Sequence, residues 1–224
     1  MKKLFATALF CTIFASAASA VTINFYDFDE GDVLGIGTDL GDGVLADVTA
    51  IGGIAQAVVF DTARGTVSTG NDPDLTSPFT NAEDSSDRRG FGNALIVQEN
   101  ATGGPDDVVG GSLIFNFDAL WSFASLFLLD AEVGTSATLF NGSDEVMSFT
   151  LNSGNESETG SNPRNNEFTL LGFAGAVGDT LRIDFAGSGA LGEFEVSAVP
   201  LPAGLSLLLA GLGALVLVRR RQTA

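Results

Sequence analysis

The chain is divided into short runs of β-branched and aromatic residues separated by Gly, Asn and Asp, and this pattern constrains its fold most strongly. The run Leu181-Arg182-Ile183-Asp184-Phe185 alternates apolar and polar residues with period two, which is typical of a half-buried strand. Eleven such runs occur, at 22–28, 44–51, 55–61, 94–98, 112–118, 122–129, 137–141, 145–152, 167–173, 180–185 and 192–198. The polar segments 68–89 and 153–166 are expected to be surface loops. We predict an all-β chain with a single β-sandwich of jelly-roll type over residues 21–198.

The N-terminus has the pattern of a secretory signal peptide. Lys2 and Lys3 precede an apolar stretch at 4–15, and Ala18-Ser19-Ala20 supplies small residues for cleavage before Val21. The apolar stretch is short and is not followed by a basic stop, which disfavours a membrane anchor. We therefore predict a signal peptide at 1–20 and export of the chain.

The C-terminus contains an uncharged apolar stretch at 201–218, followed by Arg219, Arg220 and Arg221. About 17 residues in a helix are enough to span a bilayer. Since proline does not fit a helix interior, the sequence predicts one transmembrane helix over about 203–218. The basic stop keeps the extreme C-terminus cytoplasmic, so residues 21–198 are expected outside the inner membrane.

A short motif precedes this helix: Val199, Pro200, Leu201, Pro202 and Ala203. The motif, helix and arginine cluster, together at 199–224, resemble the sorting tail of PEP-CTERM proteins in its VPLPA variant. That resemblance implies a membrane-embedded exosortase as processing partner, with anchoring in the inner membrane before processing and a cell-surface or extracellular location afterwards. It also implies an association with exopolysaccharide and biofilm matrix. The alternative is an ordinary single-pass anchor.

The central region also resembles the β-sandwich ectodomains of PEP-CTERM surface proteins. The segments that carry this resemblance include 92–99, 110–115 and 187–191, in that order. The likeness implies a non-catalytic module, similar in character to carbohydrate-binding modules and stabilised by Ca²⁺. Trp121 and Tyr26 are expected to pack in the core, and stacking of either ring on a sugar is the alternative.

Composition excludes several classes of function. Outside the two terminal signals, five arginines stand against 28 acidic residues, a formal charge of about −23. Nucleic acid requires basic patches, so it is not an expected partner. The chain has no histidine, its single Cys11 lies in the signal peptide, and no lysine follows Lys3. Histidine- and cysteine-dependent catalysis and Schiff-base chemistry are thereby excluded.

Acidic residues follow several predicted strands and are candidate Ca²⁺ ligands: Asp61, Asp72, Asp74, Glu99, Asp106 and Asp107. Ca²⁺ takes six to eight oxygen ligands, and closely spaced carboxylates repel one another without a cation. If the loop after Asp61 packs beside the loop after Glu99, these oxygens would converge. The alternative is that Asp and Pro simply form turns here.

We therefore expect an exported, non-catalytic surface or matrix protein that is stabilised by Ca²⁺ and associated with exopolysaccharide. A structural surface protein without a specific ligand is the first alternative. A glycoside hydrolase that uses two carboxylates is the second, because that mechanism needs neither histidine nor cysteine.

Overall fold

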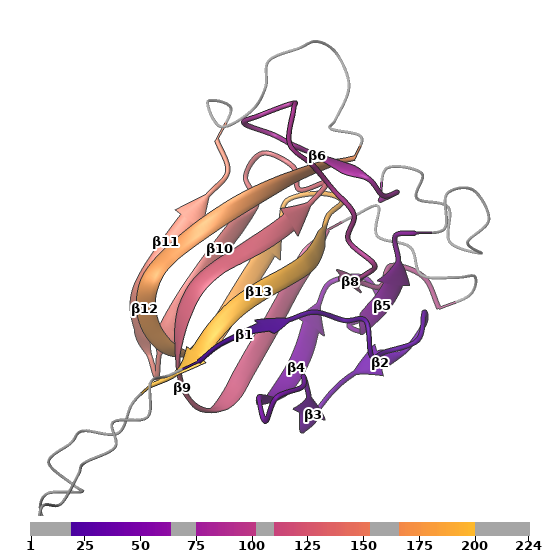
Figure 1. Cartoon of the computed structure of the whole chain (residues 1–224). Coiled ribbons are helices and arrows are strands. Elements are labelled where there is room, and N and C mark those ends of the chain that lie inside the picture. The colour runs from indigo at the N-terminus through magenta and orange to yellow at the C-terminus, as the bar shows by residue number, and fades with distance from the viewer. Residues whose placement is uncertain (1–18, 64–74, 102–109, 153–165, 200–224) are drawn as a thin grey trace, which may run out of the picture. The chain divides into compact units, whose positions relative to one another are not determined.

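A computed structural model describes residues 19–63, 75–101, 110–152 and 166–199 of the chain. Residues Ser19–Ala198 form one compact unit (Figure 1). In the described ranges the secondary structure is all-β, and no helix there is long and apolar enough to cross a membrane. Residues 1–18 of the predicted signal peptide lie outside the described residues. So do Pro200–Ala203 of the sorting motif, the predicted helix at 203–218 and the arginines 219–221.

Thirteen strands in these ranges belong to one hydrogen-bonded sheet, which is antiparallel except where β6 meets β12. Their bounds are β1 Ala20–Ile23, β2 Val33–Leu34, β3 Thr38–Asp39, β4 Leu45–Ile51, β5 Ala57–Asp61, β6 Phe79–Asn81, β7 Arg88–Arg89, β8 Asn93–Val97, β9 Gly111–Leu129, β10 Ser136–Asn141, β11 Asp144–Thr150, β12 Glu167–Phe185 and β13 Ala190–Ala198.

The two longest strands, β9 and β12, run antiparallel as one bent ribbon (Figure 1). The first part of β9 pairs with β4 on one side and with the last part of β12 on the other. Beyond residue 120, β9 pairs with β13 and with the first part of β12. Register shifts between Gly172 and Ala176 and between Gly178 and Thr180 interrupt the ribbon near its bend. The ribbon therefore joins two layers, as expected when bulges bend a strand.

The first layer consists of β3, β4, the first part of β9, the last part of β12, β10 and β11. The second consists of the remaining parts of β12 and β9, β13, β1, β8, β5 and β2. Aromatic rings connect the layers: Phe115 of the first lies 5.6 Å from Phe194 of the second, edge to face. Phe149 of β11 and Phe173 of β12 are 5.1 Å apart in the same manner. The sheet thus packs against itself as a β-sandwich.

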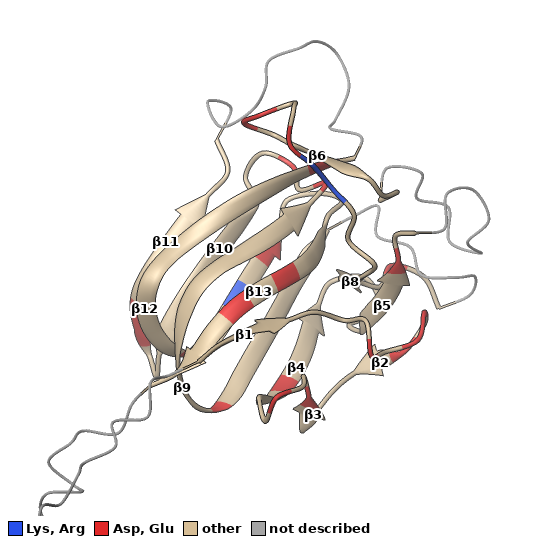
Figure 2. Ribbon diagram, viewed as in Figure 1, with Lys and Arg blue, Asp and Glu red and all other residues tan. Residues whose placement is uncertain are grey.

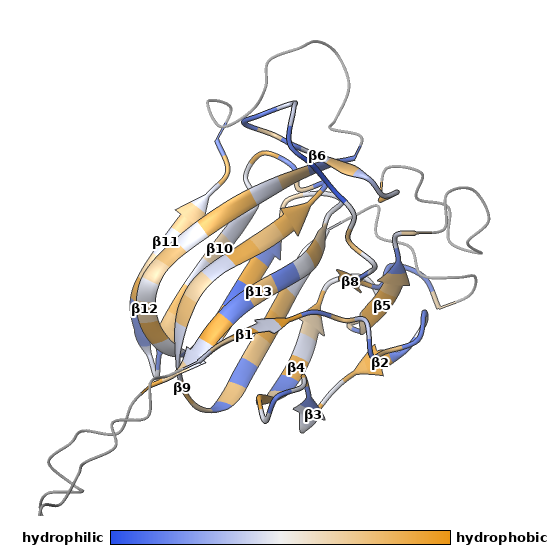
Figure 3. Cartoon of the chain, in the orientation of Figure 1, coloured by the Kyte–Doolittle hydropathy of each residue, from blue (hydrophilic) through white to orange (hydrophobic). Residues whose placement is uncertain are grey.

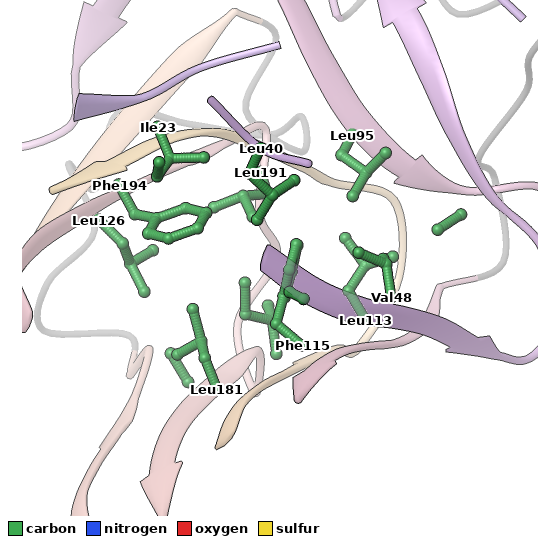
Figure 4. Packing of buried hydrophobic residues seen from close by; sticks show 14 of the residues in the cluster. Ile23, Leu40, Val48, Leu95, Leu113, Phe115, Leu126, Leu181, Leu191 and Phe194 are labelled. Carbon is green, nitrogen blue, oxygen red and sulfur yellow. The ribbon is translucent and has the colours of Figure 1, made fainter. Parts of the chain in front are cut away.

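The core between the layers comes from alternate residues of each strand. Figure 4 shows Val48, Leu113, Phe115 and Leu181 from the first layer approaching Leu126 and Phe194 from the second. All of these side chains are buried. Figure 3 shows the corresponding alternation of hydrophobic and hydrophilic residues along β9 and β12. Burial of these side chains is the main favourable term for the fold, at about 25 cal/mol per Å² of apolar surface.

A second cluster of buried residues covers the outer side of the second layer. Its members include Phe60 and Ile96 on β5 and β8, Phe127 on β9 and Phe168 on β12. The segment from Leu75 to Phe91, which carries β6 and β7, packs onto them. The second layer is therefore buried on both faces at this end, whereas the outer face of the first layer is largely polar.

Most predicted strands are confirmed, but the short strands β2 and β3 were not predicted. Other differences concern the predicted segments themselves. The runs at 112–118 and 122–129 are parts of one strand, β9, and those at 167–173 and 180–185 are parts of β12. The first strand ends at Ile23, because the next residues turn: Tyr26 N donates to Asn24 Oδ1 over 3.2 Å. The predicted loop at 68–89 contains β6 and β7.

Candidate functional site

The predicted Ca²⁺ ligands are only partly described by the structure. Asp72, Asp74, Asp106 and Asp107 lie outside the described residues. Asp61 ends β5, and its Oδ1 accepts a hydrogen bond of 2.8 Å from Ala63 N. Acidic residues in Figure 2 are spread over several strands and turns. Within the described ranges no group of three or more His, Cys, Asp or Glu side chains is arranged to hold a metal ion.

Asp61 and Glu99 lie at opposite ends of the β5–β8 pair. Asp61 pairs with Asn93 at the start of β8, whereas Glu99 follows the end of β8, near Gly53. The six steps along the chain from Asn93 to Glu99 span about 20 Å when the chain is extended. Asp61 and Glu99, which flank the starts of the two loops, are therefore far apart. The loops themselves, at 64–74 and 102–109, lie outside the described residues, so their packing stays a prediction. Antiparallel pairing of β5 with β8 separates Asp61 from Glu99, and one ion cannot bind both side chains.

A candidate binding surface among the described residues is the outer face of the first layer, which we call the polar face. Strand registers align its residues in three rows across β4, β9, β12, β10 and β11. Five strands at about 4.8 Å spacing make the face about 19 Å wide. The rows are Ile51, Ser112, Asp184, Ser136 and Thr150; Thr49, Ile114, Arg182, Thr138 and Ser148; and Asp47, Asn116, Thr180, Phe140 and Glu145.

Glycines fix the position of the first row. Gly110 and Gly111 have φ angles of +76° and +147° and lead into β9. A Cβ on Gly110 would lie 2.6 Å from the carbonyl oxygens of Phe185 and Gly187, and one on Gly111 would lie 2.4 Å from that of Ile51. Only glycine allows these backbones to approach so closely. This close approach sets Ser112 of β9 between Ile51 of β4 and Asp184 of β12.

An ion pair occupies the middle of the polar face. Arg182 Nε lies 2.9 and 2.8 Å from the two carboxylate oxygens of Asp184, and Arg182 Nη2 lies 2.7 Å from Oδ1. Ser112 Oγ donates to the same Oδ1 over 2.5 Å. The hydrogen bond with Asp184, and then its negative charge, raises the pKa of Arg182 above its ordinary value. The pair is thus held in one arrangement before any ligand arrives.

Other side chains of the polar face are also hydrogen-bonded to one another. The hydroxyls of Thr138 and Ser148 are 2.9 Å apart, and Thr180 Oγ1 donates to Asn116 Oδ1 over 3.3 Å. Ser, Thr, Asn and Asp side chains have few rotamers to lose, so ordering them on binding costs little entropy. A face built from such residues suits ligand recognition better than one built from long lysine and glutamate side chains.

The two residues considered for sugar stacking behave differently. Trp121 is buried in the main core, with 9% of its surface exposed, and so packs as expected. Tyr26 is 52% exposed, and its ring lies against Gly92, where a Cβ would be 2.4 Å from Cε1. Tyr26 belongs to the turn after β1, away from the polar face.

The polar face could not be predicted from the sequence. The alternation at 181–185 predicted correctly that Arg182 and Asp184 share one side of a strand, but no sequence signal showed which strands lie beside it. The chain order of β4, β9, β10, β11 and β12 differs from their spatial order, so long-range pairing alone assembles the face.

No protein-family model and no curated protein matches the chain. Among solved structures, the carbohydrate-binding module CBM32-3 from a family 31 glycoside hydrolase of Clostridium perfringens is similar to part of it. This likeness has a TM-score of 0.28 and 14% identity, and it covers 45% of the chain and 70% of the module. A likeness this distant supports no statement about fold or ligand.

Proposed function

We propose that the chain is an exported, non-catalytic surface or extracellular protein that associates with exopolysaccharide through the polar face. The observation that supports this most is the set of in-register rows on the outer face of the first layer, in which short hydrogen-bonding side chains predominate. Sugar hydroxyls both donate and accept hydrogen bonds, so they match a surface that alternates carboxylate, hydroxyl, amide and guanidinium groups. We further propose that the β-sandwich that carries this face is of the jelly-roll type.

In this proposal, the two termini direct export, membrane anchoring and processing of the chain. The signal peptide at 1–20 directs export, and the helix at 203–218 anchors the chain in the inner membrane. An exosortase-type enzyme then acts at Val199–Ala203, after which the protein reaches the surface or the medium. The absence of histidine, and of cysteine and lysine beyond the signal peptide, supports a non-catalytic role.

Ca²⁺ is a separate part of the proposal. Asp72 and Asp74 follow Asp61 in the chain, and Asp106 and Asp107 follow Glu99. Because Asp61 and Glu99 lie at opposite ends of the β5–β8 pair, an ion would bind with one group or with the other. Removing Ca²⁺ with EDTA is expected to lower the melting temperature. An unchanged melting temperature would remove Ca²⁺ from the proposal and leave the polar face unaffected.

Affinity electrophoresis of the full chain in detergent tests the polysaccharide association. Gels containing neutral and acidic polysaccharides are compared with gels lacking polymer, and retardation by at least one polymer is expected. Migration unaffected by every polymer would favour a structural surface protein without a ligand. Release of new reducing ends from a retarding polymer would favour a glycoside hydrolase instead.

A further inference from the structure

We propose that Arg182 and Asp184 form the central subsite of the polar face and bind a vicinal diol of a neutral polysaccharide. This inference rests on the proposed function and specifies its ligand. β12 is the middle strand of the five that form the polar face, and Arg182 lies in the middle row. A polymer crossing the face along that row contacts Arg182 at its midpoint.

The pair has hydrogen-bonding capacity left for a ligand. The bonds to Asp184 use Nε and Nη2 of Arg182, and within the described residues Nη1 makes none. The guanidinium has five N–H groups in a planar fork, so donors remain. The side chains of Arg182 and Asp184 are 43% and 36% exposed. One hydroxyl of a diol can accept from the guanidinium while its neighbour donates to the carboxylate.

The charge of the polar face favours a neutral polymer. Asp47, Asp184 and Glu145 supply three carboxylates, and Arg182 supplies the one positive charge among its fifteen residues. With the strongly acidic chain around it, this face repels a polyanion. The arginine is already engaged by Asp184, so it offers a hydrogen-bond donor more than an unpaired positive charge.

Apolar groups beside the ion pair complete the subsite. Ile114 is the neighbour of Arg182 in the same row, on β9, and Phe140 stands in the next row on β10. Both are partly exposed. The C–H face of a sugar ring packs on such groups while its hydroxyls bond at the ring edge. This combination of apolar and polar groups favours a sugar polymer over a purely ionic ligand.

Affinity electrophoresis of the full chain tests the subsite, with dextran, galactomannan and hydroxyethyl cellulose as neutral probes and alginate as the anionic probe. Arg182→Lys keeps the charge and removes the planar fork, and Asp184→Asn keeps the size and removes the charge. Each is expected to weaken binding of the retarding neutral polymer by at least about tenfold. Arg88→Lys on β7 and Glu195→Gln on β13 are the matched controls and should bind as the parent chain does.

Near-ultraviolet circular dichroism checks that each variant is folded, and Asn116→Ala supplies a second probe of the polar face. Loss of binding in Asn116→Ala with full binding in both central variants would overturn the subsite but keep the proposed function. Stronger retardation by alginate than by every neutral polymer would overturn the assignment to neutral ligands. Failure of the parent chain to bind any of the four polymers would overturn the subsite and contradict the proposed function as well.

Discussion

Gly110 lies where three backbone segments meet beside the polar face. Its φ is +76°, and a Cβ at this position would lie 2.6 Å from two carbonyl oxygens, which leaves no room for a side chain. Gly110→Ala is expected to destabilise the fold by about 2–3 kcal/mol, from backbone strain and steric overlap together. Urea unfolding followed by tryptophan fluorescence measures the loss.

Gly142 provides the matched control, because it also has a positive φ, of +60°, but no atom lies within 4 Å of its Cβ position. Gly142→Ala should cost about 1 kcal/mol, since only the backbone strain remains. Equal losses in the two variants would contradict the steric account of Gly110.

The pKa of the Glu193 carboxyl, on β13, is raised above its ordinary value. Burial is the main cause, Glu195 adds to it, and Arg89 opposes it. The folded state therefore holds this proton more tightly than the unfolded state, so the ionised side chain is a cost that grows as pH rises above the ordinary value of 4.5. Glu193→Gln removes this cost.

We expect Glu193→Gln to raise the melting temperature at about pH 7, where the parent side chain is ionised in the unfolded state, by a few degrees at most. The gain should shrink towards zero as pH falls below the ordinary pKa. Thermal melts of both chains across this pH range measure the difference. Glu83→Gln, in an exposed turn, is the control, and a gain that did not depend on pH would contradict the explanation.

At the scale of elements, alternation predicted the strands well but missed how they continue. The runs predicted at 167–173 and 180–185 are parts of the single strand β12. In the structure Ala174 and Gly175 have φ of +51° and +80°, and the strand passes through them as a bulge. A bulge and a turn use the same residues and differ only in whether a partner strand continues alongside.

The separation of Asp61 from Glu99 could not be predicted either, for a related reason. Asp61 ends β5 and Glu99 comes after the end of β8, but the two strands are antiparallel neighbours. In an antiparallel pair, the C-terminal end of one strand lies beside the N-terminal end of the other. Two residues at the C-terminal ends of such strands therefore lie at opposite ends of the pair. The pairing of β5 with β8 is a long-range property, and neither segment encodes it alone.

The two layers of the molecule are held together in part by Phe194 of β13, which contacts rings of the first layer. Its ring lies within 6.3 Å of the rings of Phe115, Phe117 and Phe123, and it is 1% exposed. Phe194→Ala is expected to cost about 3–5 kcal/mol, because it leaves a cavity between the layers. Because both layers share this contact, the variant should still unfold in one transition. Calorimetry measures both quantities, and separate transitions for the two layers would contradict a shared core.

The first and last strands of the compact unit are neighbours. β1 runs antiparallel to the end of β13, with Ala20 opposite Ser197. A short peptide could therefore join Ser197 to Val21, the first residue after the predicted signal peptide. A new opening at the exposed β10–β11 turn would then give a circular permutant with the same sheet. In such a rearranged molecule, the polar face would be displayed from a different point of attachment.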